Sequence, residues 1–316
     1  MVFKKLLGAI GVGGPSVDTV LDTGSAAPGG TLSGQVRLRG GQADVTIEHI
    51  TLDLVARVEA EGHDGEHEGT VVFDRITIGG GIRLAEGEEH SVPFTASLPW
   101  ETPVTELHGQ PLGVGVRTEL AVADAKDKGD LDPLRVRPLP VQEAILEAFG
   151  HLGYGFKSAD LEVGRIRGTG QQLPFYQEIE LTPPAQYAHA VNEIEVTFLA
   201  TPGGMEVVIE VDKGGHVLNG YSSEGRDAVT RFTVSHHNVQ HIDWNAEVDA
   251  WTKQLVDRHG QHAGHHGGHH RSGTGAVAGV AAGVAVAAGG MVAAEVVDEI
   301  GDAFEDAEDD EGSDEE

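Results

Sequence analysis

The sequence predicts a mainly β protein that consists of two antiparallel β-sandwich domains in series. Apolar and polar residues alternate in short runs, which is the pattern of strands with one buried face. Clusters of glycine and proline separate the runs as turns do, and 45 Gly against 9 Phe, 4 Tyr and 3 Trp favours many short elements over a helical bundle. A parallel sheet would need crossover helices, and none is visible between the first strands. A chain of 316 residues has the length of two such domains.

A short amphipathic helix is predicted at the start of the chain. Phe3, Leu6, Leu7 and Ile10 have the spacing of one helical face. The apolar run resembles the core of a signal peptide, but no small-residue cleavage site follows it closely. We therefore expect this helix to pack against the first domain, with contact to a membrane surface as the alternative. The absence of cysteine fits a reducing compartment, so we expect a cytoplasmic protein that is at most peripheral to a membrane.

The first sandwich is expected to span residues 1–130. Residues 50–58 alternate as a strand with one mostly buried face, and so do residues 92–98 and 112–122. Turns are predicted between such runs because proline presets φ and glycine tolerates a positive φ. The predicted turns include Pro28-Gly29-Gly30, Gly40-Gly41 and Gly79-Gly80-Gly81.

A linker with one short helix is expected over residues 131–154. A polar stretch at residues 125–130 and three prolines mark the break between the domains. The helix is predicted from the spacing of Val141, Ile145, Phe149 and Leu152.

The second sandwich is expected over residues 155–257. Its best hairpin signal is Thr201-Pro202-Gly203-Gly204, which lies between the alternating runs 193–199 and 205–211. Further strands are predicted at residues 161–166, 175–181 and 229–234. A closing helix is predicted from Trp244, Val248, Trp251 and Leu255, with Asp243 as its N-cap.

Residues 258–316 form a low-complexity tail whose first part is rich in histidine. Six imidazoles fall within twelve residues and could bind Zn²⁺ or Ni²⁺ through nitrogen, while a plain flexible linker is the alternative. The candidate metal ligands are His259, His262, His265, His266, His269 and His270.

The rest of the tail is first uncharged and then strongly acidic. Residues 273–294 carry no charge, and Gly275, Gly279 and Gly283 repeat the G-x-x-x-G spacing of closely packed helices. This stretch predicts a self-associating or peripheral helix, a flexible linker or a weak transmembrane helix. Residues 298–316 hold twelve acidic and no basic side chains, which is typical of a solvated tail.

No constellation of residues in the sequence points to catalysis. His63-Asp64-Gly65-Glu66-His67 matches a zinc-protease pattern, but that chemistry needs a helix and we expect a loop here. His236, His237 and His241 are expected to be surface or partly buried side chains. The carboxylates of Glu178 and Glu180, and those of Glu193 and Glu195, are each expected to share a solvated strand face. A net charge of −30 argues against nucleic-acid partners.

Several ordered blocks resemble the bacterial sporulation-control protein family (SpoOM-like) over roughly residues 1–257. The blocks are Gly11-Val12-Gly13-Gly14-Pro15-Ser16-Val17-Asp18-Thr19, Pro28-Gly29, Gly34-Gln35-Val36, Gly40-Gly41, Ile47-Glu48-His49-Ile50, residues 88–94, residues 98–103, Gln177-Glu178-Ile179-Glu180 and Pro202-Gly203-Gly204. The resemblance implies an arrestin-like fold, a role as regulator or adaptor and no catalytic residues.

Together these observations predict a non-enzymatic regulatory adaptor of arrestin-like fold. It would act through protein–protein interaction in sporulation or development, where the process is implied by the resemblance alone. The alternative is a membrane-associated, metal-responsive protein that acts through its histidine-rich and glycine-zipper tail, a segment that could also mediate homo-oligomer formation.

Overall fold

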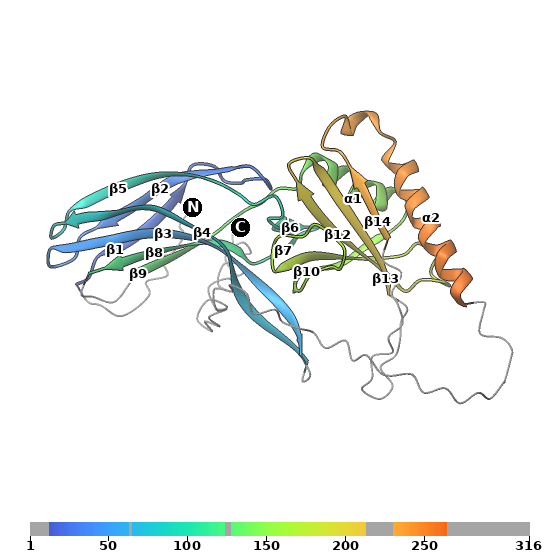
Figure 1. Ribbon diagram of the computed structural model, residues 1–316, viewed down its shortest axis with the longest axis horizontal. Helices are drawn as coiled ribbons and strands as arrows, with labels where there is room; N and C mark the ends of the chain where they lie inside the picture. Colours follow the sequence, from blue (N-terminus) through green and yellow to red (C-terminus); the bar gives the residue numbers. More distant parts are fainter. Residues whose placement is uncertain (1–12, 63–64, 124–127, 213–229, 264–316) are drawn as a thin grey trace, which may run out of the picture.

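The computed structural model describes residues 13–62, 65–123, 128–212 and 230–263 (Figure 1). Within these residues the chain is mainly β, as predicted, and two helices follow the first group of strands. The expected helix at residues 3–10 lies outside the described residues. The strands and helices divide into an N-terminal unit and a C-terminal unit, which are described in turn.

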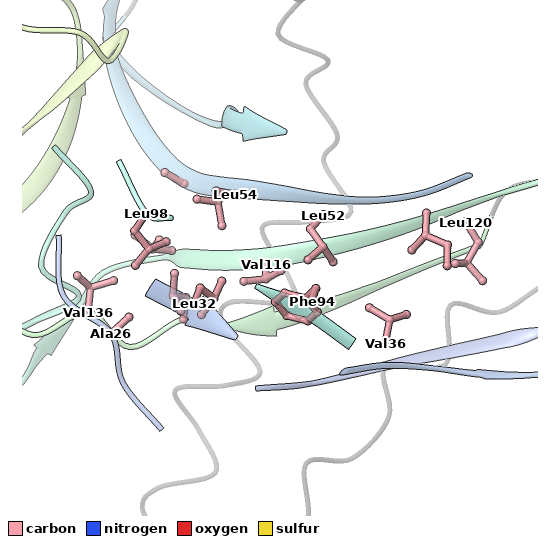
Figure 2. Close-up of a cluster of buried hydrophobic side chains, with 14 of the residues drawn as sticks. Ala26, Leu32, Val36, Leu52, Leu54, Phe94, Leu98, Val116, Leu120 and Val136 are labelled. Carbon is pink, nitrogen blue, oxygen red and sulfur yellow. The ribbon is translucent and has the colours of Figure 1, made fainter. Parts of the chain in front are cut away.

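The N-terminal unit is a sandwich of two facing antiparallel sheets. One sheet has the order β1 (Ser16–Leu21), β2 (Thr31–Arg39) and β5 (Glu89–Ser97). In the facing sheet, β3 (Val45–Gly62) pairs with β4 (Gly65–Leu84) on one side and β8 (Val114–Val122) on the other, and β9 (Lys128–Pro133) pairs with β8. The alternation in these strands brings one set of side chains between the sheets, where Leu32, Val36, Leu52, Leu54 and Phe94 form part of the core (Figure 2).

The C-terminal unit consists of one antiparallel sheet and two helices. The sheet has the order β10 (Gly155–Val163), β11 (Phe175–Thr182), β12 (Glu193–Thr201), β13 (Gly204–Asp212) and β14 (Thr230–Val234). Helices α1 (Pro140–His151) and α2 (Trp244–Ala263) pack on it, and a 3₁₀ turn, η1 (Val239–His241), precedes α2. Ile145 and Phe149 of α1 and Val248 of α2 share a buried cluster with Ile194 and Val207 of the sheet.

This layer of helices is where the C-terminal unit differs from the sandwich expected from the sequence. Among the described strands no second sheet covers β10–β14, and α1 and α2 form the facing layer instead. These helices were interpreted from the sequence as a linker helix and a closing helix. In the structure their apolar residues, including Ile145, Phe149, Val248 and Leu255, are buried in the same cluster as residues of the sheet. The other sheet face carries carboxylates, which a second apolar layer would have to desolvate.

The two units share a sheet. The parallel pairing of β10 with β3, at Glu162 and Glu59, makes β14-β13-β12-β11-β10-β3-β8-β9 one continuous path of strands. The apolar core is also shared, because Leu161, Leu173 and Phe175 belong to the same buried cluster as the sandwich residues. Residues 134–136 add Leu134 and Val136 to that cluster, so the first core continues past β9.

Three local features depart from the sequence-based expectations. Gly79, Gly80 and Gly81 lie inside β4 and not in a turn, and a Cβ on Gly80 would come within 2.2 Å of the Glu48 carbonyl oxygen. Glu66 and His67 lie on β4 and not in a loop. Helix α2 continues to Ala263, beyond residue 257, where the second domain was expected to end. None of the helices in the described residues is long and apolar enough to cross a membrane.

Two short connections complete the arrangement. β6 (Glu106–Leu107) and β7 (Gln110–Pro111) form a small hairpin between the units. The Pro202-Gly203 turn joins β12 to β13, with Thr201 paired to Gly204 as the hairpin signal predicted.

Candidate functional site

The junction of the two units brings together several polar side chains from both units. It lies where β3 of the sandwich meets β10 of the C-terminal unit (Figure 1). Gln110 of β7 also contacts β10 there: its Nε2 donates to the Ala159 carbonyl at 2.9 Å, and its Oε1 accepts from the Ala159 N–H at 3.1 Å. The side-chain amide thus takes the place of a paired strand on this part of β10.

A fully buried aspartate lies in the middle of β3, six residues before the residue that pairs with β10. Asp53 pairs in register with Arg75 of β4 and with Arg117 of β8. Its Oδ1 accepts from Arg75 Nε at 2.6 Å, and its Oδ2 accepts from Arg75 Nη2 and Arg117 Nη2, both at 2.7 Å. Burial by itself would raise the pKa of the Asp53 carboxyl, but the hydrogen bonds from both guanidinium groups hold the pKa below its usual value.

This network was not predicted from the sequence. Thr51, Asp53 and Val55 occupy the alternate positions that we expected to face solvent, yet all three are buried in the structure. The one available signal was Val55, an apolar residue among polar ones. Because Asp53 is ionised and fully engaged by two cations, it serves to fix the strands and is not available as a general base.

A second set of contacts joins the connection after β5 to the C-terminal unit. The Glu101 carboxylate accepts hydrogen bonds from the N–H groups of Gln172 and Leu173, at 2.8–2.9 Å. Gln177 of β11 accepts from the Val104 N–H at 3.0 Å and donates to the Val104 carbonyl at 2.8 Å. These contacts bind the chain between the units to the β10–β11 loop and to β11.

Trp100 lies in the same connection and has close neighbours on both sides. Its ring stacks on His236, with ring centroids 5.2 Å apart and planes at 22°. On the other side Gly29, at φ +67, lies so close that an added Cβ would come within 2.3 Å of the indole. His236 also contacts the Thr201 carbonyl through Nε2 at 2.8 Å. The three histidines were expected to be surface or partly buried, and in the structure His236 is half-buried while His237 and His241 are exposed.

The outer face of the C-terminal sheet carries the paired carboxylates noticed in the sequence. Glu178 and Glu180 do share one face, but they and Glu193 and Glu195 are half-buried and not freely solvated as expected. Burial raises the pKa of Glu178 to about 9, and nearby carboxylates, Glu195 first among them, add to the rise.

A lysine neutralises one end of this face. Lys157 Nζ lies 2.8 Å from Glu180 Oε2 and 2.5 Å from Glu193 Oε2. Ser158 also donates a hydrogen bond to Glu180. Burial by itself would raise the pKa of the Glu180 carboxyl. The hydrogen bonds from Lys157 and Ser158 outweigh this effect and keep the pKa below its usual value, in contrast to the pKa of Glu178.

The candidate metal ligands of the tail fall mostly outside the described residues. His259 and His262 lie within α2, whereas His265, His266, His269 and His270 follow its end. His63 of the zinc-protease pattern is also outside, and His67 lies on a strand, where residues four apart do not form a helical face. In the part of the chain that the structure describes, no group of three or more His, Asp and Glu side chains is placed to hold a metal.

Comparison with known proteins identifies a matching family model and similar proteins. The family model described as SpoOM protein matches residues 3–215. The sporulation-control protein spo0M of Bacillus subtilis (strain 168) is 30% identical over 260 residues, which cover 82% of this chain and 99% of the relative. The crystal structure of Spo0M from Bacillus subtilis is similar with a TM-score of 0.68 at 29% identity, covering 78% of this chain and 100% of that one.

Proposed function

Because this chain belongs to the SpoOM family of sporulation-control proteins, we propose that it is a non-enzymatic adaptor that regulates sporulation or development by binding other proteins. Family membership supports the regulatory role and its link to sporulation. The adaptor mechanism and the cytoplasmic location are our own extension of it.

The observation that carries the proposal is the built junction between the units. A shared sheet, a shared apolar core and the contacts of Glu101 and Gln177 hold the two units in one arrangement. A molecule that presents surfaces from both units in a fixed geometry suits a scaffold for partners, because preorganised surfaces lose little entropy on binding. An adaptor needs no reacting group, and the buried Asp53 is engaged in structure.

Cross-linking in the source bacterium tests this proposal. We would compare the full chain, a chain ending at Ala263 and the junction variant Glu101→Ala/Gln177→Ala at matched expression. We expect the first two to cross-link to the same partner proteins and the junction variant to lose a part of them. A partner set that disappears on removal of residues 264–316 would assign recognition to the tail, and no reproducible partner for the full chain would overturn the proposal.

Metal binding by the six tail histidines is a separate proposal that rests on their spacing in the sequence alone. Calorimetric titration of the full chain with Zn²⁺ and with Ni²⁺ tests it, with a variant in which all six are serine as the control. Binding tighter than about 10 µM that the variant lacks would support it, and equal heats for both proteins would exclude it.

The proposed peripheral membrane contact and self-association of the tail are tested in the same way. Flotation with liposomes and sedimentation of the full chain would be compared with the chain ending at Ala263. Both properties should disappear with the tail if residues 273–294 cause them, and neither is needed for the adaptor function.

A further inference from the structure

The distal half of the β3–β4 hairpin presents an open strand edge. Residues 65–72 of β4 pair with residues 55–62 of β3 in unbroken antiparallel register. The register shifts only below this segment, where the pairing moves from Val55–Val72 to Leu54–Asp74 and leaves Phe73 as a bulge. Among the described strands β4 pairs with β3 alone, so none of them adds to the outer edge of β4. Figure 1 shows this part of the hairpin extending beyond both units.

The hairpin is fixed at its base, so this edge is preformed. The opposite side of the hairpin is covered where β10 pairs with β3 at Glu59. The bulged Phe73 packs edge-to-face on Phe175 of β11, with ring centroids 5.6 Å apart. Arg75, just below, is held by the buried Asp53. A strand held in this way can accept a partner strand with little ordering of its own.

Two residue types that commonly protect a strand edge are missing from this strand. Lysine and proline often block the edges of sheets against pairing, and β4 contains neither over Gly65–Leu84. Gly69 lies in the open segment, and a Cβ built on it would have no atom within 4 Å. The two bulges of β4 lie at or below Phe73, so the segment 65–72 itself stays regular.

The charge along the hairpin indicates the chemistry of the missing strand. Acidic residues occupy the alternate positions 66 and 68 of β4, and alternate positions of a strand belong to one face. Glu68 is exposed, so a cationic side chain from a third strand could approach its carboxylate.

We propose that the edge of β4 over residues 65–72 is a docking site for an extended segment of another protein that carries Lys or Arg at alternate positions. The segment would add to the sheet as a further strand, with main-chain hydrogen bonds providing affinity and the cations selecting the partner. This inference rests on the proposed adaptor function, because it names the kind of partner that one surface of the adaptor takes.

Hydrogen exchange of the full chain with a synthetic peptide tests the site directly. The probe is a ten-residue peptide in which lysine and threonine alternate, and its control has the same sequence with every second backbone amide N-methylated. We expect the probe to slow exchange within residues 65–72 and the N-methylated peptide to have at least tenfold weaker binding, because it cannot form the strand ladder. Protection that appears only elsewhere in the chain would overturn the proposal.

Matched charge variants separate this site from general attraction to an acidic protein. Glu68→Lys changes the charge at the edge, and Glu147→Lys makes the same change at an exposed position on α1. We expect the first to weaken peptide binding at least tenfold and the second to stay within twofold of the unchanged protein. Equal weakening by both would show that only net charge matters and would overturn the proposal.

Melting temperatures distinguish weakened binding from loss of structure, because Glu68 is exposed and its replacement leaves the buried core unchanged. We expect the melting temperature of Glu68→Lys to match that of the unchanged protein while its peptide binding is at least tenfold weaker. The same variant in the cross-linking experiment distinguishes the two proposals. A partner set that survives Glu68→Lys removes the β4 edge as the docking site and leaves the adaptor function standing, whereas the absence of partners for the full chain removes the adaptor function itself.

Discussion

At the scale of single residues, the buried charge of Asp53 is the clearest case in which one side chain determines local structure. Its carboxylate has no exposed surface and is bound by a guanidinium from each neighbouring strand. Ion pairs of this kind are weak grounds for stability when both partners are present, but removal of one partner leaves buried charge without compensation. The network therefore makes the register of β4, β3 and β8 costly to change.

Replacement of Asp53 by asparagine should destabilise the protein strongly. Asp53→Asn keeps the size of the side chain but removes the charge that binds Arg75 and Arg117. We expect the free energy of unfolding to fall by about 2–4 kcal/mol, measured by urea denaturation. The control is Asp44→Asn, which breaks an exposed pair with Arg83 and should cost much less, because exposed ion pairs contribute little to stability. Similar losses for both variants would contradict the structural role assigned to Asp53.

A second carboxyl, Asp132 of β9, should make stability depend on pH. Burial, followed by the charges of Asp130 and Asp18, raises the pKa of Asp132 to about 8. Between pH 4 and this value the folded state holds a proton that the unfolded state has lost, so the contribution to stability falls as pH rises. We expect Asp132→Asn to gain at least ~1 kcal/mol relative to the unchanged protein between pH 5 and pH 8.5.

Denaturation curves of both proteins at the two pH values provide this measurement. The difference between the two proteins is the relevant quantity, because groups distant from Asp132 titrate equally in both and only Asp132 with its neighbour Asp130 differs. A difference that stays constant with pH would mean that Asp132 is ionised in the folded protein across the range.

At the scale of elements, the strands and helices were largely predictable and the layers were not. Alternation of apolar residues located β3, β5 and β8, and helical spacing located α1 and α2, because each pattern follows from which side of an element is buried. The same patterns do not predict which element packs against the buried side. Helix α2 was therefore interpreted only as a closing helix, while in the structure α1 and α2 together form the layer that a second sheet would otherwise provide.

Glycine and polar residues misled the sequence reading where their role depends on a neighbouring strand. Gly79-Gly80-Gly81 has the composition of a turn, but Gly80 is required inside β4 because the backbone of β3 passes too close for a Cβ. Asp53 looked like a solvent-facing position because its two arginine partners lie 22 and 64 residues away in the sequence. Contacts of that range are set by topology, which the local pattern does not contain.

The N-cap of α2 offers a prediction at this scale. Asp243 Oδ1 accepts the Ala246 N–H at 3.1 Å, which satisfies one of the free N–H groups of the first turn. We expect Asp243→Ala to lower the free energy of unfolding by about 1 kcal/mol. Asp243→Asn retains the acceptor and should lose much less in the same denaturation experiment. An equal loss in both variants would assign the effect to the charge and not to the cap.

At the scale of the whole molecule, the question is whether the two units unfold together. The parallel contact between β3 and β10 extends over a single register pair, Glu59 with Glu162, which by itself would bind the units weakly. The buried cluster that includes Leu161 and Phe175, together with the hydrogen bonds of Glu101 and Gln177, adds the contacts that a cooperative transition needs.

Removal of these hydrogen bonds should uncouple the units. Glu101→Ala/Gln177→Ala eliminates the acceptor for the N–H groups of Gln172 and Leu173 and both bonds to Val104. It leaves the core of each unit unchanged. We expect calorimetry to record one transition for the unchanged protein and two for the double variant, with hydrogen exchange assigning the first to β10–β14 or to the sandwich. A single transition at lower temperature in the variant would mean that the shared sheet and the shared core are sufficient to couple the units. The fixed geometry proposed for the adaptor would then depend on the sheet and the core and not on these hydrogen bonds.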